Sequence, residues 1–443
     1  ILLIYYLIKK KTPPLMDLKI FKDKFFYDNF LINPDKNLSR VKSILSKLGN
    51  PEATLSNVIH IAGTNGKGST LAFLKSCLIE NNYSVNAFVS PHLKTLNERI
   101  IIKGSIIDDD SLDQVIRECL SILGKKKISF FEFMTACAFE LFKRNTSDWS
   151  LIEVGMGGSH DATNSIPNKD LSIITPISLD HEIFLGETIK KIATEKLGII
   201  NHKSTVVFGP QEESLEDLIK DTLSQKNSTG FFYGKDWTIK KINRIIKYED
   251  GDNKIEFQSI GLKGDHQIIN AGMCIASLKI LQRKEKIELN DNQIKDGIAK
   301  TFWPGRLTEL SRGLKIINNV SCDIWVDGCH NPAGSNVIAE EIIRMNEKNK
   351  KETVLILGMS KDKKIDKFLD NFKGIVREIL VVPIKNRESI NFDQVTNASK
   401  GMGFNILEKQ SISEALESIA RRDNLRILIC GSLYLAAEAL LMD

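Results

Sequence analysis

The eight residues from Gly63 to Thr70 constrain the fold of this chain more than any other segment, and they read Gly-Thr-Asn-Gly-Lys-Gly-Ser-Thr. The apolar run Val58–Ala62 precedes them and predicts a short buried strand, whereas Lys67–Glu80 has helical periodicity. Glycines between a strand and a helix let the backbone turn tightly and direct N–H groups toward anionic oxygens. We therefore interpret Gly63–Thr70 as a phosphate-binding loop; a glycine-rich helix start that binds nothing is the alternative.

The polar side chains of this loop fit the phosphates of a nucleoside triphosphate. Lys67 can supply a cation for the β- and γ-phosphates, and Ser69 or Thr70 a hydroxyl for Mg²⁺. The spacing differs from the usual G-x-x-x-x-G-K-[ST], because Ile61 occupies the first glycine position and Gly68 separates Lys67 from Ser69. ATP is expected rather than GTP, since the sequence has no Asn-Lys-x-Asp motif for guanine. The residues expected to bind the nucleotide here are Gly63, Thr64, Asn65, Gly66, Lys67, Gly68, Ser69 and Thr70.

Length and composition describe a globular protein of more than one domain. A chain of 443 residues is too long for one compact core. The net charge of +5 is small and the charges alternate in sign, so neither nucleic-acid binding nor a basic membrane-binding patch is indicated. Seven cysteines include no Cys-x-x-Cys pair and most lie in apolar runs, which favours free thiols in a reducing compartment. We expect a cytoplasmic protein, monomeric, with small-molecule substrates.

Strand-like and helical segments alternate from about residue 57 onward, which predicts an α/β fold with a mostly parallel sheet. A break at Trp303-Pro304-Gly305-Arg306 divides this series into two. The expected domains are a P-loop ATP-binding domain over 16–302 and a smaller, Rossmann-like α/β domain over 303–443. Trp237–Tyr248 and Lys254–Gln258 alternate polar and apolar side chains and predict antiparallel ribbons that decorate the first domain.

The first fifteen residues do not fit this pattern. Ile1–Ile8 is apolar and precedes three lysines, but eight residues cannot span a bilayer and no signal-peptide cleavage site follows. Met16 stands just before a polar segment. We expect residues 1–15 to be an extension outside the natural protein, with a short membrane-surface anchor as the alternative.

Further motifs follow the loop in a fixed order, and together they resemble the folate-forming branch of the Mur ligase superfamily, dihydrofolate synthase and folylpolyglutamate synthase. The resemblance extends over nearly the whole chain after Asn37. Any one motif would be weak, whereas their shared order is specific. The matching segments are Leu48-Gly49-Asn50-Pro51, Ser90-Pro91-His92-Leu93, Phe131-Glu132, Glu153-Val154-Gly155-Met156-Gly157-Gly158, Asp161-Ala162-Thr163-Asn164, Leu179-Asp180-His181, Leu185-Gly186, Ile192–Ile199, His266-Gln267, Asn270-Ala271, Pro304-Gly305-Arg306, Asp327–Pro332 and Gly431-Ser432.

The resemblance implies ATP-dependent addition of L-glutamate to dihydropteroate, and to reduced folates, through an acyl phosphate. Such a reaction needs charge neutralisation at the transferring phosphoryl group, in-line positioning and exclusion of water. An enzyme with only one of the two folate activities is an alternative. A peptidoglycan-type Mur amino-acid ligase is less favoured, because only about 60 residues precede the loop, near the lower limit for any domain. A non-catalytic ATP-dependent switch is the third interpretation.

The resemblance also implies two Mg²⁺ positions. They would be held by Ser69 or Thr70 with Ser90, Glu153 and His181, and by Lys196 as a carbamate, which turns a cation into an anionic ligand. From the residues alone, Glu195-Lys196 reads as an ordinary solvated helix face and His181 as an ordinary histidine. Only their places in the family motifs assign them to the site.

The remaining site residues are implied in the same way. Asn270 and Arg306 match nucleotide-contacting positions, Asp327 a ribose-binding position, and His330 a position near the γ-phosphate or the arriving amine. Lys67, Lys196, Arg306 and His330 are the expected catalytic residues, and the expected substrate residues are Phe131, Glu132 and Asp161. Ser159-His160 replaces the usual Arg-Leu, so the arginine expected to contact the anion or substrate is absent from this motif, and Cys329 replaces a usual alanine.

Overall fold

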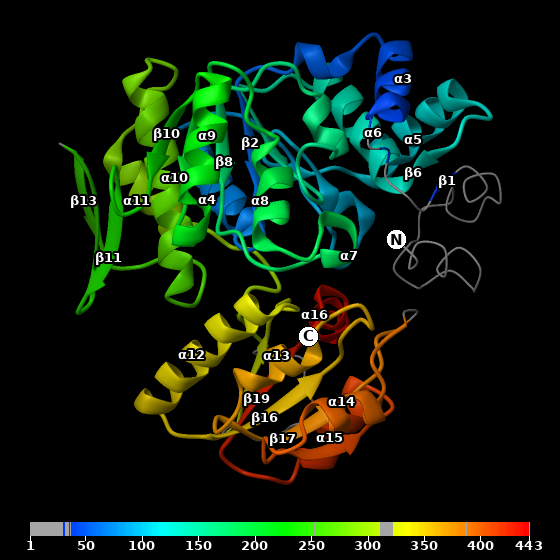
Figure 1. Ribbon diagram of the computed structural model, residues 1–443, viewed down its shortest axis with the longest axis vertical. Helices are drawn as coiled ribbons and strands as arrows, with labels where there is room; N and C mark the ends of the chain where they lie inside the picture. The colour runs from blue at the N-terminus through cyan, green and yellow to red at the C-terminus, as the bar shows by residue number, and fades with distance from the viewer. Residues whose placement is uncertain are drawn as a thin grey trace. The chain divides into compact units, whose positions relative to one another are not determined.

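The computed structural model describes residues 30–31, 35, 37–251, 253–310, 322–385 and 388–442. The predicted extension over residues 1–15 lies outside this range. The chain divides into two compact units. The first comprises the residues up to Gly261 together with Gln267–Phe302, and the second comprises Leu262–His266 together with Trp303–Asp443. Each unit is an α/β structure with its own sheet, so the predicted fold class is confirmed (Figure 1).

The first unit is built on an eight-stranded sheet in the order β10-β9-β8-β2-β7-β3-β4-β5. All neighbours are parallel except the two pairs that contain β4. The sequence predicted β2, β7, β8 and β9 to within about two residues at each end, but it did not identify β3, β4, β5 or β10. The strands are β2 (Val58–Ala62), β3 (Val85–Phe88), β4 (Ile100–Ile102), β5 (Ser105–Ile106), β7 (Trp149–Glu153), β8 (Leu171–Ile174), β9 (Thr205–Phe208) and β10 (Thr229–Phe232), and a short pair outside this sheet joins β1 (Phe30–Leu31) to β6 (Ile128–Ser129).

Two hydrophobic clusters fix helices against this sheet. One joins β2, β3 and β7 to α3 (Ser39–Lys47), α5 (Asp109–Leu123) and α6 (Phe130–Arg144). The other joins β2, β7, β8 and β9 to α8 (Ile189–Leu197) and α9 (Glu216–Lys226). Further helices are α4 (Lys67–Glu80), α7 (Glu182–Leu185), α10 (His266–Arg283) and α11 (Asp291–Lys300).

Helices α4 and α10 are buried on nearly every side, as an apolar helix without a polar face must be. Their side chains meet at Cys77 and Cys274, whose sulfur atoms lie 3.8 Å apart. The predicted bounds of α4 are confirmed, and those of α10 differ by one residue at each end. Helix α4 carries Lys67 and α10 carries Asn270.

An antiparallel ribbon of three strands lies at one side of the first unit, beside α10 and α11 (Figure 1). Its strands are β11 (Thr238–Ile242), β12 (Ile245–Asp250) and β13 (Asn253–Phe257). The ribbon confirms the prediction from the two alternating segments Trp237–Tyr248 and Lys254–Gln258. Inward-facing Ile239, Ile246, Tyr248 and Ile255 are buried, as the period of two requires.

The second unit has a six-stranded sheet in the order β14-β15-β19-β16-β17-β18, parallel except at the β14 edge. Its core gathers apolar residues of β15, β16, β17 and β19 with those of α12 and α13. The predicted strands and helices of this unit are present, with β14, β18 and α13 added. The elements are β14 (Thr308–Glu309), β15 (Asp323–Val326), α12 (Pro332–Lys348), β16 (Glu352–Leu357), α13 (Ile365–Asp370), β17 (Val376–Val381), α14 (Phe392–Ala398), β18 (Asn405–Glu408), α15 (Ile412–Ile419), β19 (Leu425–Cys430) and α16 (Leu433–Leu440).

Within the described residues, no helix is both long and apolar enough to cross a membrane.

Candidate active site

The carboxyl ends of four neighbouring strands bring the predicted residues of the first unit together. Strand β2 lies between β7 and β8, and β3 is the next strand beyond β7. From β2 the chain runs to β3 on one side of the sheet, and after β7 it crosses to β8 on the other side of β2. The direction of strand addition therefore reverses at β2. Ligands of open α/β sheets bind in the crevice at such a reversal. Gly63, Ser90, Glu153 and Thr175 all stand at this edge, each within two residues of the end of its strand.

The loop between β2 and α4 is pinned to the segment that follows β8. The backbone N–H groups of Thr64 and Asn65 donate to the carbonyl oxygen of Pro176, at 3.0 and 3.3 Å. The Thr64 hydroxyl donates to the Ser178 carbonyl and accepts from the Ser178 N–H, both at 3.0 Å. These bonds tie the loop to the segment after β8, and such internal support is the preorganisation that phosphate binding requires.

Two glycines of the loop are required by close contacts. A Cβ atom on Gly63 would stand 1.9 Å from the Thr175 hydroxyl oxygen, and one on Gly66 would stand 2.5 Å from Oδ1 of Asn270. Gly66 also has φ +92°, in the left-handed region. The contact between Gly66 and Asn270 brings α10 against the start of α4. Asn270, predicted to contact nucleotide, is thus buried beside the loop, where its amide donates to Gln267 at 2.8 Å.

We expect Gly66→Ala to destabilise the protein more than Gly234→Ala does. Gly234 has a similar φ of +83°, but no atom lies within 4 Å of a Cβ built on it. The stability lost in Gly234→Ala therefore measures only the cost of a left-handed backbone conformation at alanine, about 1 kcal/mol. Gly66→Ala adds overpacking against Asn270, roughly 1–3 kcal/mol more. Urea unfolding of both variants measures the difference. Equal losses of stability would show that the Gly66–Asn270 contact is not a tight one.

Two lysines converge on one carbonyl oxygen of the loop. The Lys67 ammonium donates to the Gly63 carbonyl at 3.1 Å, and the Lys196 ammonium donates to the same oxygen at 2.8 Å. Lys67 also donates to the Thr64 carbonyl at 3.2 Å. Burial, and next the nearby Lys67 charge, lower the pKa of Lys196 to about 7, although Asp180, Asp161 and Glu195 oppose the shift. Lys67 therefore offers positive charge to an anionic ligand at the loop, whereas the Lys196 amine is partly neutral near pH 7.

Oxygen atoms suited to a hard cation lie beside these lysines. Ser69 and Thr70 are buried in the first turn of α4, and within the described part of the chain the Thr70 hydroxyl has no hydrogen-bond partner. Glu153 is buried at the end of β7, and one of its oxygens accepts from the Ser90 N–H at 3.1 Å. A buried hydroxyl without a partner and a buried carboxylate are the donor set that Mg²⁺ takes in proteins. The residues present therefore fit the ion.

His181 lies at the same edge, after β8. It precedes α7 in a left-handed conformation, φ +52°, and its side chain is 38% exposed. Its backbone N–H donates to Asp180 at 2.9 Å, and its Nε2 is 3.8 Å from the other Asp180 oxygen. The imidazole is thus held near a carboxylate and remains accessible from solvent.

The three predicted substrate residues have different surroundings. The Phe131 ring is partly exposed, lies over Gly155 so closely that a Cβ there would meet it at 2.5 Å, and packs on Phe88 with a ring-centroid distance of 5.7 Å. Glu132 is buried; it accepts from the Arg40 guanidinium, at 2.9 Å, and completes a capping box with Ser129 at the start of α6.

Asp161 is also committed to internal hydrogen bonds. One oxygen accepts from the N–H and hydroxyl of Thr163, and the other accepts from the Met156 N–H at 2.9 Å. Thr163 in turn contacts Nε2 of the buried His60 at 2.8 Å. Glu132 and Asp161 therefore fix the local backbone on which any substrate contact would rest.

The second unit holds the other predicted residues around the end of β15. Asp327 is buried and accepts from the N–H groups of Leu307, at 2.8 Å, and Cys329, at 2.7 Å. Burial raises the pKa of Asp327, and the Arg306 charge opposes that rise. Nδ1 of His330 lies 2.9 Å from the Gly328 carbonyl oxygen. Arg306, Asp327 and His330 thus form one polar group on the second unit.

The sequence missed several residues that shape the site. Thr175 and Ser178 pack on the loop, and Asn164 and Lys169 anchor the end of α8. The Lys169 ammonium donates to Asn164 and to the Ile199 carbonyl, and burial lowers its pKa to about 7. Thr175 directly follows β8, and Asn164 closes the Asp161-Ala162-Thr163-Asn164 motif, and these two positions were the available signals.

Known proteins share both the sequence and the fold of this chain. The Mur ligase middle domain family matches residues 61–278. Dihydrofolate synthetase of Saccharomyces cerevisiae is 32% identical over 421 residues, which is 91% of this chain and 96% of the yeast protein. The chain belongs to the dihydrofolate synthase/folylpolyglutamate synthase family.

Bacterial members agree with this assignment. Dihydrofolate synthase/folylpolyglutamate synthase of Escherichia coli is 29% identical over 92% of this chain and 91% of its own length. A solved structure of Escherichia coli FolC in complex with DHPP and ADP has a TM-score of 0.81 at 26% identity and covers 93% of each chain. The resemblance read from the motifs is therefore confirmed.

Ser159-His160, which replaces the Arg-Leu usual in this family, contacts the helix that carries Lys196. The Ser159 N–H and hydroxyl donate to the Glu195 carbonyl, at 2.7 and 3.1 Å, and Nδ1 of His160 lies 3.0 Å from the Glu195 carboxylate. His160 is 44% exposed. Ser159 and His160 thus both contact Glu195, on the helix that carries Lys196.

Proposed function

We propose that this protein uses ATP to join L-glutamate to dihydropteroate, and also to reduced folates, through an acyl-phosphate intermediate. The observation that carries the proposal is the convergence of Lys67 and Lys196 on the Gly63 carbonyl, beside the buried carboxylate of Glu153. The Lys67 ammonium supplies positive charge where a γ-phosphate would be transferred, and the Lys196 amine, with a pKa of about 7, is neutral often enough to form the anionic carbamate. The family assignment supports the choice of a folate carboxylate and glutamate as the two partners.

The reaction has two steps. A carboxylate oxygen of dihydropteroate attacks the γ-phosphorus as the bond to ADP breaks, and a mixed carboxylic–phosphoric anhydride forms. The uncharged amine of L-glutamate then adds to the activated carbonyl carbon. Phosphate leaves with the former carboxylate oxygen and the amine loses a proton, so an amide remains. Lys67 stabilises the charge on the phosphoryl oxygens in the first step, and the N–H groups of the loop orient them.

Mg²⁺ fits the oxygen donors described above, and when bound it would offset the charge of the β- and γ-phosphates. We propose that Ser90, Glu153 and His181 contribute to two positions, and that Ser69 or Thr70 completes the first. The second position would use Lys196 after it has reacted with carbon dioxide. In that reaction the neutral amine nitrogen bonds to the carbon of CO₂, one proton is released and an anionic carbamate results. An amine whose pKa is about 7 is neutral often enough for this addition.

The second unit would complete the reaction. We propose residues 16–302 as the ATP-binding domain and 303–443 as the glutamate-ligase domain. Asn270 and Arg306 would contact the nucleotide, Asp327 the ribose, and His330 the γ-phosphate or the arriving amine. Phe131 would contact the pterin through its partly exposed ring, with Glu132 and Asp161 fixing the backbone around it. The free state of all seven cysteines supports a reducing, cytoplasmic location, and we propose a monomer.

Phosphate release tests the ligase reaction. We expect release from ATP only when dihydropteroate and L-glutamate are both present, because the acyl phosphate is consumed by the amine. A UDP-linked peptidoglycan precursor in place of dihydropteroate is the control, and it should give no release. Release with ATP alone would contradict the proposal, and release only with the UDP-linked substrate would identify a different ligase.

The two folate activities are separated by comparing acceptors. We expect product from dihydropteroate and from tetrahydrofolate, since both present a carboxylate to the same phosphoryl group. Mass spectrometry of the products counts the added glutamates. Product from only one acceptor would mean an enzyme with a single activity.

A further inference from the structure

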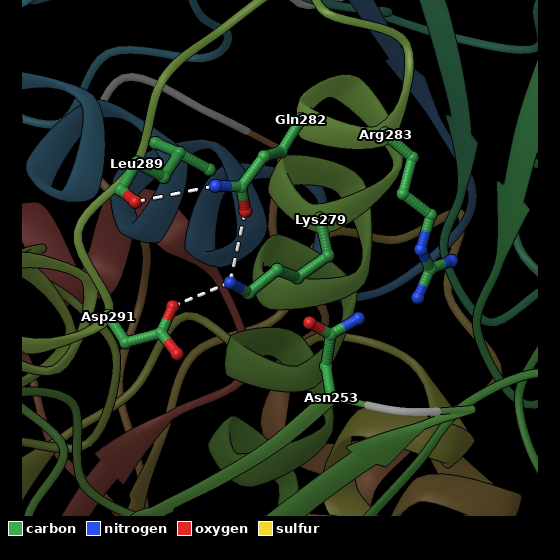
Figure 2. A pocket seen from close by; sticks show the side chains of 6 residues that line it. All are labelled: Asn253, Lys279, Gln282, Arg283, Leu289 and Asp291. Carbon is green, nitrogen blue, oxygen red and sulfur yellow. Dashed lines mark hydrogen bonds and ion pairs between the residues drawn. The ribbon is translucent and has the colours of Figure 1, made fainter.

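A polar cavity lies far along α10 from the phosphate loop. Its volume is about 540 Å³, within the range of small-molecule sites, and Figure 2 shows its lining. The lining residues come from α10, from the start of β13, from the start of α11 and from the connection that precedes α11: Asn253, Lys279, Gln282, Arg283, Leu289 and Asp291. Lys279 is nine residues beyond Asn270, about 14 Å along the helix axis. The cavity therefore does not belong to the nucleotide site.

Three lining residues share one face of α10. Lys279, Gln282 and Arg283 are spaced i, i+3 and i+4, so their side chains leave the same side of the helix. The Lys279 side chain is only 6% exposed, which is unusual for a lysine. Gln282 holds it in place, since its oxygen accepts from Lys279 at 3.0 Å and its amide donates to the Leu289 carbonyl at 3.4 Å. The ammonium is thus fixed at the cavity wall.

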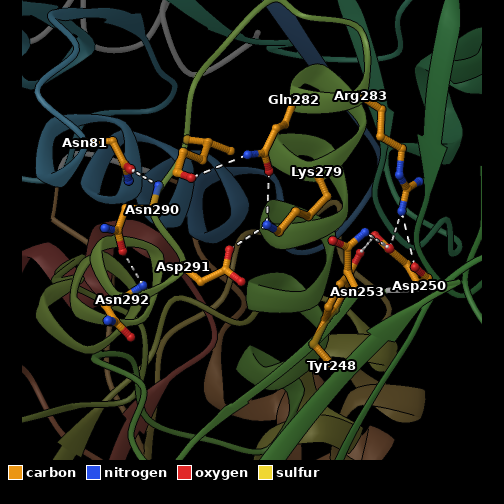
Figure 3. Close-up of polar contacts among 11 residues, drawn as sticks. Asn81, Tyr248, Asp250, Asn253, Lys279, Gln282, Arg283, Asn290, Asp291 and Asn292 are labelled. Carbon is orange, nitrogen blue, oxygen red and sulfur yellow. Dashed lines mark hydrogen bonds and ion pairs between the residues drawn. The ribbon is translucent and has the colours of Figure 1, made fainter.

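Each cation of the cavity already has one carboxylate. Lys279 donates to Oδ1 of Asp291 at 2.5 Å, and Arg283 donates through Nη2 to the buried Asp250. Asp250 also accepts from the Tyr248 hydroxyl and from the Asn253 amide, as Figure 3 shows. The four charges sum to zero, so a simple anion entering the cavity would meet the Asp291 carboxylate as well as the two cations.

The residues that line the cavity keep both hydrogen-bond donors and a hydrogen-bond acceptor that are not used within the described part of the protein. Counting only partners among the described residues, Lys279 uses two of its three N–H groups, and Arg283 leaves Nε and Nη1 without a protein acceptor. On the same count, Oδ2 of Asp291 accepts no hydrogen bond, and its side chain is 47% exposed. Figure 2 shows Lys279 and Arg283 reaching from α10 on either side of Asn253. The cavity is therefore lined both by cationic donors, on Lys279 and Arg283, and by an anionic acceptor, on Asp291.

We propose that this cavity binds a small zwitterion of the amino-acid type. Its carboxylate would lie between Lys279 and Arg283, and its ammonium group would donate to Asp291. A zwitterion can pair its carboxylate with the cations of the cavity and its ammonium group with the Asp291 carboxylate. A simple anion or a simple cation can make only one of these two pairings. The site is independent of the ligase reaction, because it needs neither nucleotide nor folate.

Isothermal titration of the full chain without nucleotide tests the site, with L-glutamine and glycine as zwitterions, acetate and inorganic phosphate as anions, and ethylamine as a cation. We expect both zwitterions to bind at least tenfold more tightly than the singly charged probes. Lys279→Met should reduce their affinity at least tenfold, whereas Lys240→Met, at an exposed position on β11, should leave it unchanged. Absence of zwitterion binding, or equal binding of phosphate, would overturn the proposal.

Asp291→Asn gives a second test that does not depend on removing the buried cation. The change makes the wall net positive, so affinity for L-glutamine should fall while affinity for phosphate rises. A purely structural role of Asp291 would lower both or neither, which would contradict the proposal. If Lys279→Met does not fold, crystals of the unmodified chain soaked in L-glutamine decide the matter, since density is expected between Lys279 and Arg283 and its absence would refute the site.

Discussion

Replacing Lys67 by alanine should lower kcat of glutamate addition by about 10²–10³-fold with either acceptor. Lys67 is held against the Gly63 and Thr64 carbonyls at the start of α4, where its charge can follow a phosphoryl group during transfer. The loop itself should keep its shape, because Thr64 and Asn65 are fixed through Pro176 and Ser178 rather than through Lys67. The measurement is steady-state phosphate release with saturating ATP.

Lys240→Ala is the matched control for this experiment, since it removes a lysine from an exposed position on β11. The control should keep the unmodified rate. Circular dichroism of both variants checks that they are folded. If Lys67→Ala keeps more than about a tenth of the normal turnover, Lys67 does not stabilise the transferred phosphoryl group.

Replacing Lys196 by alanine should abolish most of the activity, and short carboxylic acids such as acetate should restore part of it. The alanine side chain leaves space at the site where the carbamate would stand, and a free carboxylate can occupy that space as a substitute anion. Lys196→Arg is the control, because it keeps the positive charge but forms no carbamate under these conditions. It should be inactive, and acetate should not rescue it, since the larger side chain still fills the space.

The pH dependence of the same residue has a definite sign. With a pKa of about 7, the unmodified Lys196 amine is mostly neutral above pH 7 and mostly protonated below it. Only the neutral amine adds CO₂, so activation by bicarbonate should be strong above pH 7 and should fade as the pH drops below 7. Full activity of Lys196→Ala without any additive, or activity indifferent to CO₂ at every pH, would exclude a carbamate.

The loop and its helix could be predicted from sequence because their signals are local. Glycine spacing, one lysine and an apolar strand define Gly63–Thr70 within thirteen residues, and α4 begins and ends where its periodicity indicates. Strand β3 was missed because Asn86 interrupts its apolar run. In the structure this asparagine is buried and donates to the Asn145 carbonyl, at 2.6 Å, a partner that no local pattern reveals.

The environment of Lys196 shows why the contacts within the site could not all be predicted from the sequence. Its hydrogen-bond partner, the Gly63 carbonyl, is 133 residues away along the chain. From its neighbours alone Lys196 would be placed on a solvated helix face, whereas it is buried and its pKa is lowered. The family motif named the residue, but only the tertiary arrangement gives the physical reason for its chemistry. The cavity at Lys279 is a similar case, because its walls come from three separate elements.

An oxygen-18 label on the carboxylate of dihydropteroate tests the central claim most directly. If the γ-phosphate activates that carboxylate, one labelled oxygen passes to the phosphate released during turnover with ATP and L-glutamate. Mass spectrometry of the released phosphate should therefore find one oxygen-18 atom per molecule of amide formed. Unlabelled phosphate from a turnover that forms amide would contradict the account, because the oxygen lost from the carboxylate would then have left by a route other than an acyl phosphate.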